Sequence, residues 1–227
     1  MSLAKDWSED WKYIAKGELD SLRSSRPPAD YLGFIKKGYP PVILVPGITR
    51  KWGFLKSLAD KISRTGYPVY AVPELGRNVI PIPRAARIIE QLLASQNIKG
   101  GILLGHSKGG LIAKYILAHS PERGRVRAVI AIATPFYGSK MARLALSRAY
   151  QEITPESKII RELALHKSIN RKIYSIIPIY DNLLPQHSSY LPGAHNLIVY
   201  SRGHHTILFE PKTIRLILGI LTGLRRK

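Results

Sequence analysis

Apolar and polar positions follow two different periods along the chain from residue 41 onward. Short apolar runs alternate with segments in which apolar residues recur every three or four positions, the spacing typical of helices. The runs predict six strands, at 42–45, 67–72, 102–105, 126–133, 173–180 and 196–200. The helical spacing is clearest at 54–62, 85–93, 109–117 and 211–224. This alternation predicts the α/β class, with a mainly parallel six-stranded sheet flanked by helices on both faces.

The chain before this pattern is expected to form an N-terminal helical extension, residues 1–38. Trp7, Trp11 and Ile14 recur at helical spacing, which predicts a short amphipathic helix. We expect this stripe to pack on the core; the alternative is that it lies on a membrane surface, where tryptophan is favoured. Residues 39–227 are predicted to form one domain.

A longer connection, about residues 140–171, separates the fourth and fifth predicted strands. It predicts two short helices, one carrying Met141 and Leu144 and one beginning at Thr154-Pro155. We expect this insertion to form a small lid; the alternative is a pair of ordinary packing helices.

Candidate chemistry is concentrated at Gly105-His106-Ser107-Lys108-Gly109, between a predicted strand and a predicted helix. The pattern G-x-S-x-G in this context predicts a sharp turn that exposes the serine as a nucleophile. Gly105 and Gly109 would leave room for the crowded backbone. The alternative is a serine that only caps the helix. We expect the Lys108 side chain to be solvated and His106 to point away from the serine.

A serine needs a base and an acid partner, which in this arrangement follow it in the order acid, then histidine. Asp181, the single carboxylate between Glu162 and Glu210, ends the fifth predicted strand. It is the candidate acid, and the alternative is a simple Asx turn. His204 lies on the loop after the last strand and is the preferred base, with His205 as the second choice. Other histidines, expected to be structural or on the surface, are His119, His166, His187 and His195.

An oxyanion produced by attack on a carbonyl needs two N–H donors. The backbone of Lys108 is one candidate, and that of Ile48, after the first strand in Pro46-Gly47-Ile48, is the other. The alternative for the second segment is an ordinary Pro-Gly turn.

Five stretches together resemble the α/β-hydrolase superfamily, and within it small lipases and esterases of the triacylglycerol lipase type. They are residues 45–48, 105–110, 133–139, 180–185 and 203–208. The chain departs from such lipases at Pro46, where histidine is usual, and at Phe136-Tyr137. Because of these departures, the resemblance is less specific for the acyl group of the substrate than for the fold.

The resemblance implies a minimal α/β-hydrolase fold with a short helical lid. It implies hydrolysis of carboxylic esters, of lipids or other acyl groups, by Ser107, Asp181 and His204. Neither a metal nor a cofactor is expected, because the histidine and the aspartate would activate the serine. An acyltransferase or a thioesterase using the same residues is the alternative.

The charge is strongly positive, at +20 for 35 Lys and Arg against 15 Asp and Glu. The first 30 residues hold five of the basic and six of the acidic residues, so the excess lies in the remainder. Such a field attracts anionic surfaces. An anionic membrane is therefore a candidate partner, and the alternative is a generally basic, solvated surface with no such partner. Nucleic acid is disfavoured because no basic-aromatic recognition motif is present. A non-catalytic basic protein that binds membrane or nucleic acid is the remaining alternative.

The chain contains no cysteine, which excludes disulfides and a thiolate nucleophile. Its start is polar and acidic, and no run approaches the roughly 20 apolar residues of a membrane span. We therefore expect a cytoplasmic protein, with a peripheral position at the membrane as the alternative.

Overall fold

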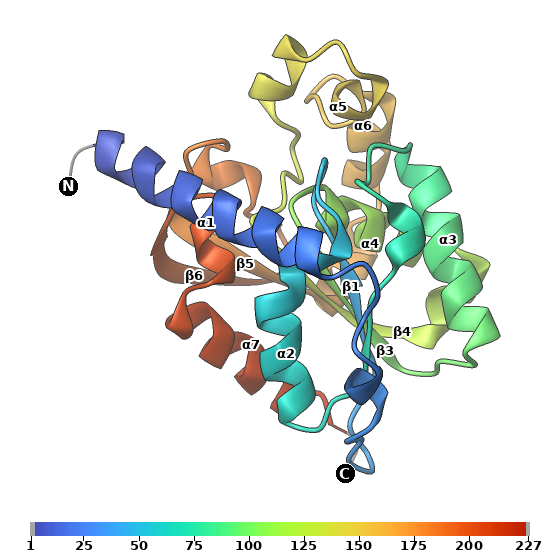
Figure 1. Ribbon diagram of the computed structural model, residues 1–227. Helices are drawn as coiled ribbons and strands as arrows, with labels where there is room; N and C mark the ends of the chain where they lie inside the picture. The colour runs from blue at the N-terminus through green and yellow to red at the C-terminus, as the bar shows by residue number, and fades with distance from the viewer. Residues whose placement is uncertain (1–2, 226–227) are drawn as a thin grey trace.

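The computed structural model describes residues 3–225, so the outermost ends of the predicted segments 1–38 and 39–227 lie outside the described residues. Six strands form one parallel sheet in the order β2-β1-β3-β4-β5-β6 (Figure 1). They are β1 (Val42–Val45), β2 (Val69–Tyr70), β3 (Gly101–His106), β4 (Val126–Ile132), β5 (Ile173–Tyr180) and β6 (His195–Arg202). The predicted α/β class and six-stranded parallel sheet are confirmed.

Helices cover both faces of this sheet. The helices of the described residues are α1 (Leu3–Arg23), α2 (Lys56–Arg64), α3 (Ile82–Ser95), α4 (Lys108–His119), α5 (Arg148–Gln151), α6 (Lys158–Leu165) and α7 (Pro211–Gly223). Of these, α2 and α7 pack on one face and α3, α4 and α6 on the other. Neighbouring strand residues face opposite layers, as at Ile43, which packs towards α3 and α4, and Leu44, which packs towards α2 and α7. Because both faces are covered, the central strands are mostly apolar rather than strictly alternating.

The second predicted strand, 67–72, is longer than the observed β2. This edge strand pairs with β1 through Val69 and Tyr70 alone. Tyr67 lies outside it and packs its ring 4.7 Å from that of Tyr39. Ala71 and Val72 are likewise buried without pairing with β1, so the apolar run reports burial in the core and extends beyond the paired residues.

The insertion between β4 and β5 differs in detail from its prediction. Met141 and Leu144 lie in a 3₁₀ segment, Lys140–Leu144, and are 46% and 84% exposed. The later helix begins at Lys158 rather than at Thr154-Pro155, because the Ser157 hydroxyl accepts the N–H of Ile160 at 3.2 Å and caps it.

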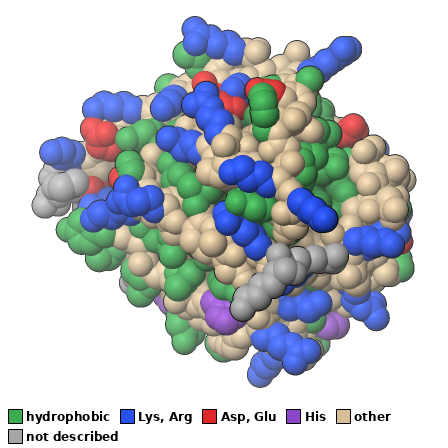
Figure 2. Space-filling view, turned by 90° about the horizontal axis from the view of Figure 1, so that it is seen from below, with side chains coloured by type: hydrophobic (Ala, Val, Ile, Leu, Met, Phe, Trp, Pro, Cys, Tyr) green, Lys and Arg blue, Asp and Glu red, His purple; other side chains and the backbone are tan. Residues whose placement is uncertain are grey.

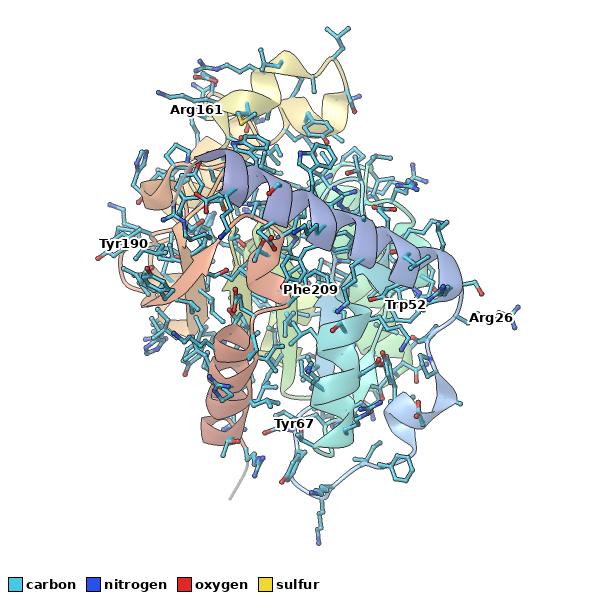
Figure 3. All side chains as sticks on the ribbon, turned by 60° about the vertical axis from the view of Figure 1, so that its left-hand side comes forward. Arg26, Trp52, Tyr67, Arg161, Tyr190 and Phe209 are labelled. Carbon is cyan, nitrogen blue, oxygen red and sulfur yellow. The ribbon has the colours of Figure 1, made fainter. Side chains whose placement is uncertain are left out.

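The N-terminal helix α1 is longer than expected and packs through a different face. Trp11 is 61% exposed, whereas Asp6, Asp10, Gly17 and Ser21 point inward and are buried. The predicted packing face is therefore wrong for Trp11, whereas Trp7 and Ile14 are half-buried. In Figure 3, α1 crosses above the labelled Phe209 and Trp52.

Small residues allow helix α1 to lie close to the body of the protein. A Cβ added to Gly17 would lie 2.5 Å from the Phe54 ring, and one added to Gly53 would lie 2.7 Å from Ser21 Cα. The helix thus approaches the body of the protein through small and acidic side chains.

Candidate active site

Ser107 is the one residue between β3 and α4, and its backbone is strained. Its φ of 52° lies in the left-handed region, which few residues other than glycine adopt. A Cβ on Gly105 would lie 2.5 Å from the carbonyl carbon of Gly109, and a Cβ on Gly109 would overlap the Val45 oxygen. The turn therefore requires glycine on both sides of the serine, as the sequence pattern predicts. Strain of this kind is typical of functional sites.

The Ser107 side chain makes no hydrogen bond to the first turn of α4, so it is not a helix cap. It lines a cavity of about 240 Å³. Both His204 and His205 line the same cavity, together with the loop after β1 and parts of the insertion. The structure thus brings the predicted nucleophile and both candidate bases to one hollow.

Asp181 follows β5 directly and contacts His204. Its Oδ2 lies 2.8 Å from His204 Nδ1, and its Oδ1 accepts the N–H groups of Leu183 and Leu184, each at 2.8 Å. Because a carboxylate only accepts, the neutral ring of His204 carries its proton on Nδ1 and has a free lone pair on Nε2. Burial opposes charging of His204, but the Asp181 carboxylate outweighs it and raises the pKa of His204 above its usual value.

The backbone of His204 is also held. Its N–H donates to Asn182 Oδ1 at 2.9 Å, and its carbonyl accepts from His106 Nε2 at 3.0 Å.

The expectation that His106 points away from the site is therefore wrong: its ring lies 4.9 Å from that of His204 and lines the cavity. Burial, with the neighbouring histidines, lowers the pKa of His106 well below its usual value, so it remains neutral. The side-chain alternation of a strand does not extend reliably to its last residue, where the chain turns.

Both predicted oxyanion donors lie beside the serine. Lys108 is the first residue of α4, so its N–H has no acceptor within the helix. Ile48 lines the cavity, and a Cβ on its neighbour Gly47 would lie 3.4 Å from Ser107 Cβ.

The Lys108 side chain is buried, which corrects the expectation that it is solvated. Its Nζ donates to the backbone oxygens of Asn78 at 3.1 Å and Ile80 at 2.6 Å. The Asn78 amide in turn donates to the Pro46 oxygen at 2.7 Å. Burial lowers the pKa of Lys108 to about 8. Sequence patterns contain no signal for this role of Asn78, because its partners are distant along the chain.

A second histidine–carboxylate pair adjoins the first. His205 Nδ1 lies 3.0 Å from Asp10 Oδ2, and both side chains are buried. Burial lowers the pKa of His205 to about 4. The hydrogen bonds from His205 outweigh burial for Asp10 and lower the pKa of that carboxyl. Nothing in the sequence indicates this pair, since nearly the whole chain separates its members.

The other histidines lie elsewhere. His195 begins β6 and stacks 4.5 Å from Tyr174, His119 packs 4.7 Å from His166, and His187 is exposed. Within residues 3–225, no group of three or more His, Cys, Asp or Glu side chains is placed to hold a metal ion.

The positive charge is not concentrated at this cavity. Lys99, Arg125, Arg127 and Lys172 line a hollow at the amino ends of the central strands, opposite the serine. Figure 2 shows Lys and Arg scattered over the face seen from below. Of the helices in the described part of the chain, none has the length and apolar character to cross a membrane.

No protein-family profile matches the sequence, and no curated protein sequence matches it significantly. Solved structures do resemble it. The mature lipase BlEst2 of Bacillus licheniformis aligns over 89% of this chain and 97% of its own, with 15% identity and a TM-score of 0.63. The metagenomic carboxyl esterase MGS0156 aligns over 88% and 78%, with 17% identity and a TM-score of 0.67.

The putative non-heme bromoperoxidase BpoC of Mycobacterium tuberculosis aligns over 82% of this chain and 93% of its own, with 13% identity and a TM-score of 0.67. Identities this low establish the architecture, and the reaction has to be argued from the site itself. The sheet order, the strained serine turn and these similarities together show that the chain has the α/β-hydrolase fold.

Proposed function

We propose that this protein is a serine hydrolase of carboxylic esters, with Ser107 as nucleophile, His204 as base and Asp181 as the acid that orients it. One observation carries the proposal. Ser107 and His204 line one cavity, while His204 donates its Nδ1 proton to a buried carboxylate at 2.8 Å. The lipase and the carboxyl esterase of similar fold support the same class of reaction.

The proposed reaction proceeds in two halves. Ser107 Oγ attacks the ester carbonyl while His204 Nε2 takes its proton, and the oxyanion receives the N–H groups of Ile48 and Lys108. The protonated His204 then donates to the leaving alcohol, which leaves an acyl group on Ser107. A water molecule, deprotonated by His204, attacks this acyl-enzyme; the acid departs and the proton returns to the serine. Asp181 stabilises the imidazolium in both halves.

The cavity favours an apolar acyl group. Its lining includes Ile48, Met141, Ala142, Tyr150, Ile153, Leu183 and Leu184. The insertion 140–171 supplies four of these, which supports its proposed role as a lid over the site.

Lipid or lipid-like esters fit this surface best. Leu144 and Leu146, 84% and 101% exposed, lie in the same insertion as part of this lining, with the exposed Arg143 and Arg148 on either side of them in the sequence. An apolar edge with a cation beside it suits contact with an anionic lipid surface, so such a surface is the proposed site of reaction.

The test is hydrolysis of p-nitrophenyl esters with acyl chains from two to sixteen carbons, with and without anionic vesicles. We expect Ser107→Ala to lower kcat by roughly 10³-fold or more. Ser147→Ala, at an exposed serine of the insertion, is the matched control and should keep full activity. A wild-type protein inactive on every ester would contradict the proposal. Faster acyl transfer to an added alcohol than to water, or a preference for thioesters, would favour the alternatives.

A further inference from the structure

We propose that Asp10 is a positioning residue for His204, so that helix α1 forms part of the active site. This inference rests on the proposed role of His204 as the base. Neither the serine motif nor the order of acid and histidine along the chain identifies Asp10.

Asp10 binds the loop that carries the two histidines. Its Oδ1 accepts the N–H groups of His205 and Thr206, each at 2.8 Å, and the Thr206 hydroxyl at 3.0 Å. The loop wraps tightly, because a Cβ on Gly203 would lie 2.5 Å from the same oxygen. Gly203 also has a φ of 131°, which a side chain would disfavour. The loop conformation is thus built around the Asp10 carboxylate.

Asn182 links this carboxylate to His204 itself. Its amide nitrogen donates to Asp10 Oδ2 at 3.2 Å, and its amide oxygen accepts the His204 N–H at 2.9 Å. Because Asn182 follows Asp181, one residue of α1 joins the acid loop to the base loop.

Asp10 also decides which histidine pairs with which acid. Adjacent histidines offer two candidate bases, and their rings lie 5.0 Å apart. Asp10 holds His205 through Nδ1, which leaves His204 to Asp181. An ionised carboxylate suits this site because it accepts at both oxygens, whereas an amide accepts at only one.

The same helix reaches the loop of the proposed oxyanion donor. Glu18 Oε1 lies 2.6 Å from Arg50 Nη1, and Arg50 lies two residues after Ile48 and lines the cavity. Helix α1 therefore contacts both loops that flank Ser107.

The test compares Asp10→Asn with Asp6→Asn. Asp6 is equally buried on the same helix but binds the Arg202 guanidinium, at 2.8 and 2.6 Å, instead of the histidine loop. We expect Asp10→Asn to lower kcat roughly 10- to 100-fold with little change in KM, since small misplacement of a base is costly to rate. Asp6→Asn should keep kcat within about 2-fold while lowering the melting temperature. Equal kcat losses in both variants, or none in Asp10→Asn, would overturn the inference.

A spectroscopic measurement separates this inference from the proposed reaction. Low-field proton NMR should show the Nδ1–H of both histidines in the wild type. Asp10→Asn should shift the His204 signal, whereas Asp6→Asn should leave it in place. An unshifted His204 signal overturns the inference even if the protein hydrolyses esters. A shifted signal supports it even if no ester is hydrolysed.

If Asp10→Asn does not fold, Asn182→Ala tests the same link. This variant removes the side chain between Asp10 and the His204 N–H and leaves the Asp10–His205 contact intact. It should also lower kcat with little change in KM, and an unchanged kcat would overturn the inference.

Discussion

The ammonium group of Lys108 lies 2.6 Å from the backbone oxygen of Ile80. The residue after the nucleophile therefore binds a loop that comes from another part of the chain. Asn78 of that loop donates to Pro46, next to the proposed oxyanion donor Ile48. The side chain of Lys108 thus supports the same site to which its backbone is proposed to contribute.

Replacing Lys108 tests whether its side chain stabilises this loop. Lys108→Met keeps most of the side-chain length but leaves two buried carbonyls without their donor. We expect the free energy of unfolding, measured in urea, to fall by about 1–3 kcal/mol. Lys114→Met is the matched control: it is buried in the same helix, but its ammonium group lies 5.7 Å from the Phe136 ring. Removing this buried charge should be neutral or stabilising, and equal losses in the two variants would contradict the prediction.

Removing the charge of Asp181 should affect rate far more than binding. Asp181→Asn no longer fixes the proton on His204 Nδ1 or stabilises the imidazolium, so we expect kcat to fall by roughly 10⁴-fold with KM little changed. The pKa of His204 should also fall, because the Asp181 carboxylate raises it in the wild type. The acid limb of kcat/KM should therefore move to lower pH in the variant. A limb that stays in place would show that the pair does not govern activity.

The two histidine pairs should give opposite pH dependences of stability. In the folded state the pKa of His205 is lowered to about 4, against about 6.5 when unfolded. The unfolded chain then binds its proton first, so the free energy of unfolding should fall by up to about 3 kcal/mol as pH drops from about 6.5 to 4. The raised pKa of His204 has the opposite effect on the free energy of unfolding. Protonation of His204 stabilises the folded state below this pKa, and that stabilisation is lost as pH rises through it.

Stability should therefore be greatest near pH 6.5, as urea unfolding between pH 4 and 8 can establish. His205→Asn should reduce the slope on the acid side of this curve, to which the lowered pKa of His106 also contributes, and leave the other side unchanged. An acid slope identical to the wild type would rule out His205 as its origin.

Two glycines in helices should respond to alanine with opposite signs. Alanine normally stabilises a helix interior by about 0.5–1 kcal/mol relative to glycine. Gly219 in α7 has nothing within 4 Å of an added Cβ, so Gly219→Ala should gain this amount. At Gly17 the added Cβ would lie 2.5 Å from Phe54, and overpacking of about 1–3 kcal/mol should outweigh the gain. Thermal unfolding measures both, and stabilisation by Gly17→Ala would contradict the close packing of α1.

Local patterns allowed much of the fold to be predicted. The strands of the sheet are recognisable because parallel strands covered on both faces must be apolar, as at 126–133. The turn at Ser107 is recognisable because only glycine fits on either side of it. Asp181 and His204 could be selected because strand ends bring their loops to one edge of the sheet. These features depend on neighbours in sequence or on the order of elements, which the chain itself displays.

The face that α1 buries could not be predicted in this way. Trp7 and Trp11 form the conspicuous stripe, yet Asp6 and Asp10 point inward because their charges meet Arg202 and His205. Burying a carboxylate is favourable only when a partner satisfies it, and the partner becomes visible only once the chain has folded. The same reason applies to the buried side chain of Lys108.

The sequence by itself therefore determined the class of fold, the strained serine turn and the short set of acid and base candidates. Tertiary structure alone decided which carboxylate meets which histidine: Asp181 holds His204, and Asp10 holds His205. Spacing along the chain reports local periodicity and steric fit. The pairing of buried charges depends on contacts between residues far apart in sequence, and a linear pattern contains no record of those contacts.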